Sequence, residues 1–335
     1  MILVDALFVN KGGGAVLLDY LIEKALQHAK KDEFFFLLDP RFAKPANLEK
    51  NFIVIPNKLS ERNKFYKKNR DRFQKIFCFG NTPPPIRTKA EVYTYVHNPK
   101  LLEAPARKFK RNYRKMYLKY LFIKLYNRNT DHYIVQIPTM LKMLMDLGLK
   151  DVAHCLTIPF YNTEKYKIGQ PSFDTRVKDE FVFISTPSPQ KNHPLLFDAW
   201  EYLLEKGLTP ILHVTIDHTA PELITRLDEL NKRGARIKNH GYIDPRELYF
   251  KCQYLIFPST TESFGLPLIE AVDSGMKVLA SDLPYVYEVI KPSLTFDPYD
   301  KASIADTVIK ALNTEPAFPE IVTKNEVDKL IDMLA

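Results

Sequence analysis

The 335-residue chain lacks the features that mark membrane-spanning and secreted proteins. No uninterrupted apolar run reaches the roughly 18 residues of a membrane span, so we expect no segment that crosses a bilayer. The N-terminal MILVDALFVN has no basic region, and its apolar run stops at Lys11 before a signal sequence could form. This segment is therefore interpreted as a first strand, and the chain is expected in the cytoplasm.

Cysteine and glycine are also scarce. Cys78, Cys155 and Cys252 lie far apart in apolar runs and show no C-x-x-C spacing, so buried free thiols are expected rather than disulfides or a cysteine zinc site. The chain has eleven glycines. None of them forms the G-x-G-x-x-G pattern, so a dinucleotide site of that type is not expected.

Acidic residues are missing from one stretch of the N-terminal half. From Ala106 to Arg128 the chain holds nine Lys or Arg and no Asp or Glu, whereas the remainder carries 39 basic and 40 acidic residues. Large apolar residues recur there at helical spacing. They are Phe109, Tyr113, Met116, Tyr120 and Ile123. We expect one basic, aromatic-rich amphipathic helix over this stretch.

Three interpretations of this helix are open. It can lie on an anionic membrane, with aromatic rings at headgroup depth and cations on lipid phosphates. Its apolar stripe can instead face the protein core, with a solvated charged back. Nucleic acid is a third and weaker interpretation, because no recognition fold, RNP-like motif or zinc spacing accompanies the charge, and no nucleic-acid partner is expected. In the membrane interpretation the protein is peripheral on the inner face of the plasma membrane, and the contact surface consists of Lys108, Lys110, Arg111, Arg114 and Lys115.

The order of apolar runs and helix-forming segments predicts an α/β fold. Short apolar runs such as EFFFLL and QYLIF alternate with helical segments in both halves, which is typical of parallel sheets with crossover helices. A chain of this length exceeds what one core usually serves. We expect an N-terminal domain over residues 1–165, a C-terminal domain over 166–312 and a helical tail over 313–335. The polar segment from Tyr161 to Glu180 is interpreted as the linker.

The most informative local pattern follows the apolar run that ends at Pro258. A polar loop carries Glu262, and a helix is expected to begin near Gly265 and Leu266. The first N–H groups of a helix favour an anion, and a diphosphate suits them. Carboxylates such as Glu262 and Glu270 can accept hydrogen bonds from sugar hydroxyls. The pattern indicates an anion site flanked by two hydroxyl-binding carboxylates.

The string from Glu262 to Glu270, followed by Ala271 and Gly275, resembles the E-x7-E signature of glycosyltransferase family 4. This resemblance implies a GT-B fold, with two Rossmann-like domains facing each other across a cleft. It also implies a retaining hexosyltransferase that moves a sugar from a UDP- or GDP-type nucleotide sugar to a glycan acceptor. The nucleotide sugar is a substrate, and no cofactor is expected. With the basic helix, the family's usual roles point to a lipid-linked intermediate of a bacterial surface polysaccharide or lipopolysaccharide.

Other segments extend the resemblance. VFISTPSPQKNHP is similar to the family's diphosphate-binding loop and implies that Lys191 contacts the phosphates, while YVHNP places His97 where members hold a donor-sugar histidine. HGYIDP resembles the segment near the base, and KGGGAV resembles the glycine loop. Catalytic roles are implied for His97, Lys191 and Glu262. The implied donor site comprises Gly13, Gly14, Ser185, Thr186, Lys191, Gly241, Tyr242, Ile243, Glu262, Ser263, Phe264, Gly265, Leu266 and Glu270.

The chain departs from the family pattern in its phosphate loop. Thr186 stands where members usually have arginine, and Ser185 stands where they have glycine. No D-x-D occurs, so no metal is predicted, and helix amides with Lys191 must neutralise the leaving group. Two alternatives remain open: a nucleotide-sugar epimerase on the same fold, and a non-catalytic basic protein that binds RNA or anionic lipid.

Overall fold

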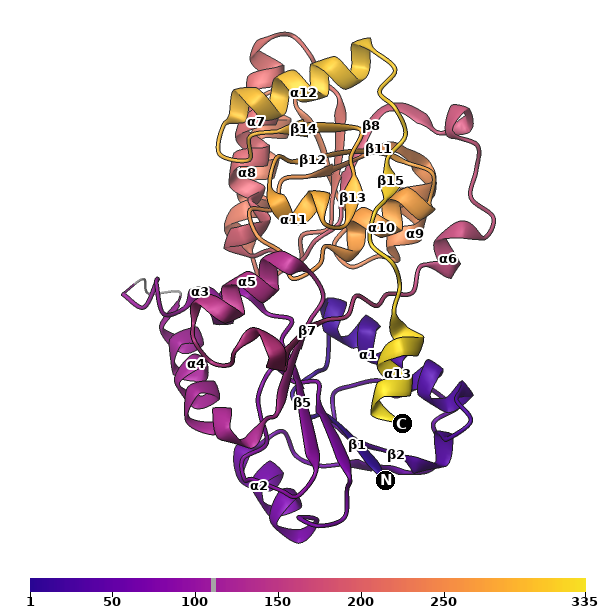
Figure 1. The fold of residues 1–335 in the computed structure, drawn as a ribbon. Helices are drawn as coiled ribbons and strands as arrows, with labels where there is room; N and C mark the ends of the chain where they lie inside the picture. The colour runs from indigo at the N-terminus through magenta and orange to yellow at the C-terminus, as the bar shows by residue number, and fades with distance from the viewer. Residues whose placement is uncertain (110–112) are drawn as a thin grey trace. The chain divides into compact units, whose positions relative to one another are not determined.

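The computed structural model describes residues 1–109 and 113–335, which form two compact units (Figure 1). The first unit comprises Met1–Asn162 with Lys324–Ala335, and the second comprises Thr163–Thr323. The chain thus returns to the first unit at Lys324, within the segment expected as a separate tail over 313–335. Of the expected membrane-surface residues, Lys110 and Arg111 lie outside the described residues.

The first unit is built on a parallel sheet of seven strands in the order β3-β2-β1-β4-β5-β6-β7. The order reverses where β4 pairs beside β1, and ligands of open α/β sheets bind at the carboxyl ends of strands near such a reversal. The bounds are β1 Ile2–Ala6, β2 Phe34–Leu38, β3 Phe52–Val54, β4 Lys75–Cys78, β5 Glu91–Tyr95, β6 His132–Val135 and β7 Cys155–Thr157.

Helices cover this sheet, and the last helix of the chain is among them. Figure 1 shows α13, in yellow, beside α1 in the first unit. Asn325 Nδ2 donates to Tyr20 Oη at 2.9 Å, and Lys75 Nζ donates to the Met333 carbonyl at 2.6 Å, which ties α13 to this unit. The bounds are α1 Gly12–Gln27, α2 Leu59–Lys68, α3 Pro99–Glu103, α4 Arg114–Tyr126, α5 Pro138–Asp146 and α13 Val327–Leu334.

The basic helix α4 begins later than expected and presents a different face. It starts at Arg114 instead of Ala106, and the side chain of Phe109 is 87% exposed outside it. Tyr113, Tyr120 and Ile123 are buried. Tyr113 Oη donates to Glu103 Oε2 on α3 at 2.6 Å. The core-facing interpretation therefore holds for this stripe, and the expectation that it lies at headgroup depth is wrong.

The second unit repeats the plan with six parallel strands in the order β10-β9-β8-β11-β12-β14. Here the order reverses between β8 and β11. The strands are β8 Val177–Phe183, β9 Ile211–Val214, β10 Arg236–Asn239, β11 Cys252–Phe257, β12 Lys277–Ser281 and β14 Leu294–Phe296, with a small antiparallel pair, β13 Ile290–Lys291 and β15 Glu320–Ile321. The helices are α6 Glu164–Lys167, α7 His193–Glu205, α8 Pro221–Lys232, α9 Pro245–Lys251, α10 Leu266–Asp273, α11 Pro284–Tyr287 and α12 Lys301–Asn313.

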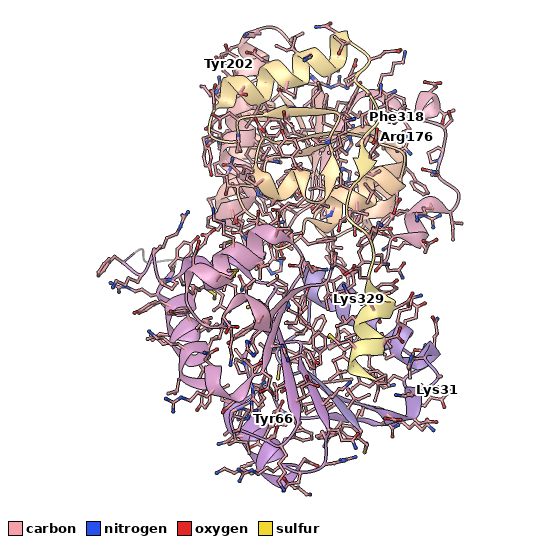
Figure 2. All side chains as sticks on the ribbon, viewed as in Figure 1. Lys31, Tyr66, Arg176, Tyr202, Phe318 and Lys329 are labelled. Atoms are coloured by element: carbon pink, nitrogen blue, oxygen red, sulfur yellow. The ribbon has the colours of Figure 1, made fainter. Side chains whose placement is uncertain are left out.

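One buried arginine, Arg176, fixes two helices of the second unit (Figure 2). Its guanidinium donates to the carbonyl oxygens of Tyr249 and Ser274, at the ends of α9 and α10, and to that of Cys252 at 3.2 Å. Cations are favourable at helix C-termini, where carbonyl groups lack intrahelical partners. Arg176 therefore sets the positions of α9 and α10 against the sheet. The three cysteines are buried and unpaired, as predicted.

Candidate functional site

The turn before α10 has the predicted geometry of a helix N-terminus. Gly265 precedes the helix at φ 90°, a left-handed conformation that favours glycine, and Pro267 lies in the first helical turn. The side chain of Phe264 is buried and anchors the turn. The turn follows β11 at the carboxyl edge of the sheet, beside the reversal of strand order. The first N–H groups of α10 can therefore meet an anion there.

Lys191 and Glu262, predicted to act on the donor, are paired in the structure. Lys191 Nζ lies 2.6 Å from Glu262 Oε1, and both side chains are largely buried. Lys191 Nζ also lies 5.5 Å from the centroid of the Phe257 ring. The two loops that carry the pair are joined by a hydrogen bond from the Thr260 N–H to the Gln190 carbonyl at 2.8 Å. The structure thus brings the predicted cation and carboxylate onto one spot.

The phosphate loop contains a histidine that sequence reasoning missed. His193 opens α7 and is fully buried, and its Nε2 lies 3.3 Å from Ser185 Oγ. Burial, together with the nearby Lys191 charge, lowers the pKa of His193 to about 4. The side chain of Thr186 is exposed. The signal available in the sequence was a histidine two residues after Lys191, at the start of a helical segment.

Glu270 lies in a different environment from Glu262. Its side chain is buried, and its Oε2 accepts a hydrogen bond from Tyr249 Oη at 3.0 Å. Burial raises the pKa of the Glu270 carboxyl, while the hydrogen bonds from Tyr249 and Tyr166 oppose that rise. The two tyrosine rings meet edge to face, with centroids 5.5 Å apart. Sequence reasoning found Glu270 and missed both tyrosines, which come from α6 and α9.

The segment expected near the base follows β10. Gly241 has φ 60°, and its N–H donates to Asn239 Oδ1 at 3.1 Å. The Tyr242 side chain is fully exposed, and Ile243 is half-buried. Tyr242 therefore stands in solvent, and its predicted contact with a base stays a prediction.

The first unit holds a pocket of about 220 Å³ at the carboxyl ends of β1, β4 and β5. His97 and Gly14 both line it, and a Cβ on Gly14 would come within 3.2 Å of His97 Nε2. Gly13, the other predicted glycine, is exposed in the first turn of α1. The remaining lining residues are Phe8, Val9, Asn10, Lys11, Gly80, Asn81 and Asn98.

Asn81 determines the protonation of His97. Asn81 Oδ1 accepts the backbone N–H of His97 at 2.7 Å, so its amide nitrogen is the atom that lies 3.1 Å from His97 Nε2. That nitrogen can only donate, so Nε2 is an acceptor and the imidazole proton resides on Nδ1. Burial lowers the pKa of His97 to about 4, which agrees with a neutral ring. Asn81 was missed, although it follows the apolar run KIFCFG in the sequence.

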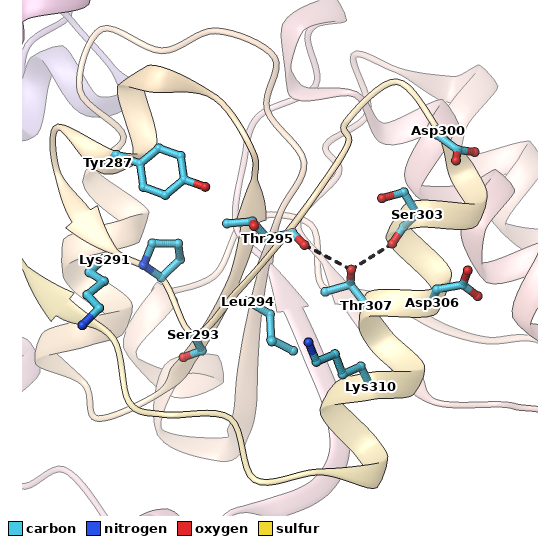
Figure 3. Close-up of a pocket in the computed structure, with 11 residues that line it drawn as sticks. Tyr287, Lys291, Ser293, Leu294, Thr295, Asp300, Ser303, Asp306, Thr307 and Lys310 are labelled. Carbon is cyan, nitrogen blue, oxygen red and sulfur yellow. Dashed lines mark hydrogen bonds between the residues drawn. The ribbon is translucent and has the colours of Figure 1, made fainter.

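A larger pocket of about 680 Å³ lies elsewhere in the second unit, beside β14 and α12 (Figure 3). Thr307 Oγ1, on its wall, is already committed to the carbonyl oxygens of Ser303 and Thr295, at 2.9 and 3.3 Å. None of the predicted site residues lines it. Its size alone assigns no chemistry, whereas the Glu262–Glu270 segment combines a helix N-terminus with paired charges.

Among the described residues, one group of side chains could ligate a metal. Glu180, His213 and Cys252 are buried and place ligand atoms within 4.8 Å of one another. Lys251 Nζ already lies 3.2 Å from Glu180 Oε2, so an ammonium neutralises this carboxylate. The group sits at the first residue of β11, whereas the α10 turn follows the last residue of that strand. It therefore supplies nothing to the predicted donor site.

Comparison with known proteins gives a family match for most of the second unit. Residues 171–326 match the family model for glycosyl transferases group 1. The chain is also 26% identical over 207 residues to O-antigen chain mannosyltransferase B of Escherichia coli, a match that covers 60% of this chain. The chain spans only half the length of that protein.

Solved structures of glycosyltransferases share the fold of the whole chain. Sucrose-phosphate synthase from Thermosynechococcus elongatus has a TM-score of 0.70 at 18% identity, covering 99% of this chain and 94% of that one. HepE of Anabaena in complex with UDP has a TM-score of 0.68 at 16% identity, covering 93% and 90%. The expected GT-B fold, with two parallel-sheet α/β units, is confirmed. Within the described part of the chain, every helix is too short or too polar to cross a bilayer.

Proposed function

We propose that this protein is a retaining, metal-independent glycosyltransferase that moves a sugar from a nucleotide sugar to a glycan acceptor. The observation that carries the proposal is the Lys191–Glu262 pair beside the N-terminus of α10, in the segment that matches the family model for glycosyl transferases group 1. A cation and helix amides at one spot suit a diphosphate, and the carboxylate suits sugar hydroxyls.

The pair provides a way to couple phosphate and sugar binding. A diphosphate that takes the Lys191 ammonium as its partner deprives Glu262 Oε1 of its contact at 2.6 Å. The released carboxylate then accepts a hydrogen bond from a donor-sugar hydroxyl. During transfer, charge grows on the leaving diphosphate, and Lys191 and the α10 amides stabilise it without a metal ion. Thr186, in place of the family's arginine, adds no charge.

Retention follows if the acceptor attacks from the face that the diphosphate leaves. A donor phosphate oxygen then takes the acceptor hydroxyl proton, and no protein carboxylate is needed as a base. Glu270 is buried against Tyr249 and is assigned to ribose hydroxyls rather than to proton transfer. His97, a neutral ring in the first-unit pocket, is assigned a hydrogen bond to the donor sugar.

The acceptor is proposed to be a lipid-linked intermediate of a bacterial surface polysaccharide or lipopolysaccharide. Support comes from the likeness to an O-antigen chain mannosyltransferase and from the basic stretch around α4. A UDP- or GDP-sugar is proposed as donor, in keeping with HepE structures that contain UDP. The described cations Lys108, Arg114 and Lys115 would then face an anionic membrane.

Thermal unfolding with UDP, GDP and other nucleoside diphosphates tests donor binding, since a ligand that binds the folded state raises Tm. The nucleotide sugar of the best base is then incubated with excess EDTA, and the sugar is followed by NMR with and without a lipid-linked glycan. Transfer only when the glycan is present supports the proposal. A new epimer without acceptor would establish the epimerase instead. Binding to a heparin column, with no change in Tm on addition of any nucleotide, would establish a non-catalytic basic protein.

A further inference from the structure

Helix α4 lies on the outside of the first unit (Figure 1), and it carries a row of exposed leucines. Leu118, Leu121 and Leu125 are 66%, 41% and 71% exposed. Their spacing of three and four residues places them on one helix face. Scattered exposed leucines are ordinary on protein surfaces, but three on one face of one helix form a continuous apolar ridge.

The ridge lies opposite the face that packs in the core. Leu118 stands two residues before the buried Tyr120, and Leu121 stands two before the buried Ile123. Two residues correspond to about 200° around an α-helix. The leucines therefore point away from the protein, and the helix has apolar residues on both its inner and its outer face.

Cations flank the ridge on both sides. Lys115 and Lys119 lie on one side of the ridge, and Lys124 lies on the other. Arg128 follows in the 3-10 turn after α4, and all four cations are exposed. No Asp or Glu occurs anywhere between Ala106 and Arg128. The outer surface of α4 is thus an apolar strip with positive edges.

The helix is held firmly enough to present this strip. Besides the Tyr113–Glu103 hydrogen bond, Asn127 Nδ2 donates to the Leu149 carbonyl at 2.6 Å, and Tyr133 Oη donates to Asn127 Oδ1 at 2.9 Å. Both ends of α4 are therefore joined to the body of the unit. The leucines are exposed because their helix is fixed in this orientation, not because the segment is detached.

We propose that α4 inserts this leucine ridge into an anionic lipid bilayer while the flanking cations bind lipid phosphates. An apolar strip with cationic edges suits an anionic membrane, because apolar side chains can enter the acyl boundary while the cations bind lipid phosphates. Three leucines offer far less than the roughly 800 Å² that a stable protein partner usually covers, and leucine is under-represented among residues that anchor such partners. This inference deepens the proposed function, because a membrane contact would bring the enzyme to a lipid-linked acceptor. It rests on the proposed function only for that acceptor.

Co-sedimentation of the full chain with phosphatidylcholine vesicles, with and without phosphatidylglycerol, tests the proposal without any nucleotide sugar. The wild type is expected to bind only the anionic vesicles. The triple variant Leu118→Ser, Leu121→Ser, Leu125→Ser should lose at least tenfold in partition coefficient at low salt, where the cations still act. The matched control, Val54→Ser, Leu59→Ser, Val152→Ser, removes three exposed apolar side chains elsewhere in the first unit and should bind as wild type does.

Insertion has its own signature. Trp200 is buried in the second unit, so a Leu121→Trp variant adds a second, exposed indole that brominated acyl chains should quench, whereas Leu59→Trp should not be quenched. Equal vesicle binding by the wild type and the leucine variant, or an unquenched Leu121→Trp, would overturn the proposal. Light scattering tests a second copy of the chain as the partner. If the wild type self-associates without binding lipid and the leucine variant does not self-associate, the ridge contacts a second copy instead of a membrane. The rise in Tm caused by UDP or GDP is measured in the same variants, so a failure of membrane binding can be told apart from a failure of donor binding.

Discussion

Lys191 Nζ and Glu262 Oε1 lie 2.6 Å apart, so the cation predicted for the phosphates and the carboxylate predicted for the sugar neutralise each other. Each side chain is about seven-eighths buried. A largely buried charge is costly without a partner, so the pair keeps both groups in place for the donor. Donor binding must then replace this ion pair by contacts of Lys191 with the diphosphate and of Glu262 with the sugar.

Lys191→Met should weaken diphosphate binding and lower kcat, because it removes positive charge that stabilises the leaving group. Glu262→Gln should instead leave the affinity for the free nucleoside diphosphate unchanged or raise it, because Lys191 no longer has a competing carboxylate. Calorimetric titration with the diphosphate, followed by steady-state kinetics, separates the two effects. If both variants weaken the free diphosphate equally, the exchange described above does not occur.

The same pair should contribute to stability. Loss of either charge should cost roughly 1–2 kcal/mol in the free energy of unfolding, less than for a fully buried pair because some solvent reaches it. The double variant should cost less than the sum of the single changes. Urea unfolding of the four proteins measures this coupling, and Lys291→Met, an exposed lysine of the same unit, serves as the control.

Tyr249→Phe should show what the hydrogen bond from Tyr249 contributes to Glu270 while the carboxylate itself is kept. The variant removes the donor at 3.0 Å and leaves the ring, so about 1 kcal/mol of stability should be lost. Tyr249 opposes the rise in the Glu270 pKa that burial causes, so its removal should raise that pKa further. As the pH is lowered, the affinity for the nucleotide sugar should therefore begin to fall at a higher pH in the variant than in the wild type. Tyr254→Phe is matched, since its hydroxyl donates to the Ala311 carbonyl at 3.0 Å, and it should leave that pH dependence unchanged.

The sequence allowed much of this site to be found where its signal is local. The strand, glycine turn and helix around Glu262 and Glu270 lie within one short segment, and helix-start chemistry predicts their geometry. Tyr249 and Asn81 were missed because their roles depend on contacts made across the fold. The sequence left the orientation of α4 open for a related reason. Its outer leucines and its inner stripe have the same helical period, and only packing against α3 determines which one is buried.

Gly14→Ala should perturb the first-unit pocket through a single contact. The new Cβ would come within 3.2 Å of His97 Nε2, so the ring or α1 must shift by a few tenths of an ångström. The expected result is a drop in kcat/KM with little change in Tm, since alanine also favours the helix. Val16→Ala changes an exposed side chain of the same helix outside the pocket and should keep full activity. Equal activity of the two variants would show that the contact has no functional effect.

Asn81→Asp tests the neutral state of His97. The pKa of His97 is about 4, whereas an unfolded histidine titrates near about 6.5, so the unfolded chain binds more protons between these values. The stability due to the neutral ring is therefore complete above about pH 6.5 and is lost as the pH falls toward 4. A carboxylate beside Nε2 favours the imidazolium and should raise the pKa of His97. The loss of stability across this window should consequently be smaller in Asn81→Asp than in the wild type.

Two measurements check this expectation: the urea midpoint at several pH values and NMR titration of the His97 ring carbons. His193 and His213 also have pKa values lowered to about 4 by burial, but they contribute equally to both proteins. The stability difference therefore reports on His97 together with the carboxylate introduced beside it, and the NMR titration isolates the imidazole. Asn98→Asp adds the same charge to the same pocket and serves as the control. If Asn98→Asp raises the His97 pKa as much as Asn81→Asp does, the cause is pocket charge alone, and the assignment of the proton to Nδ1 by Asn81 fails.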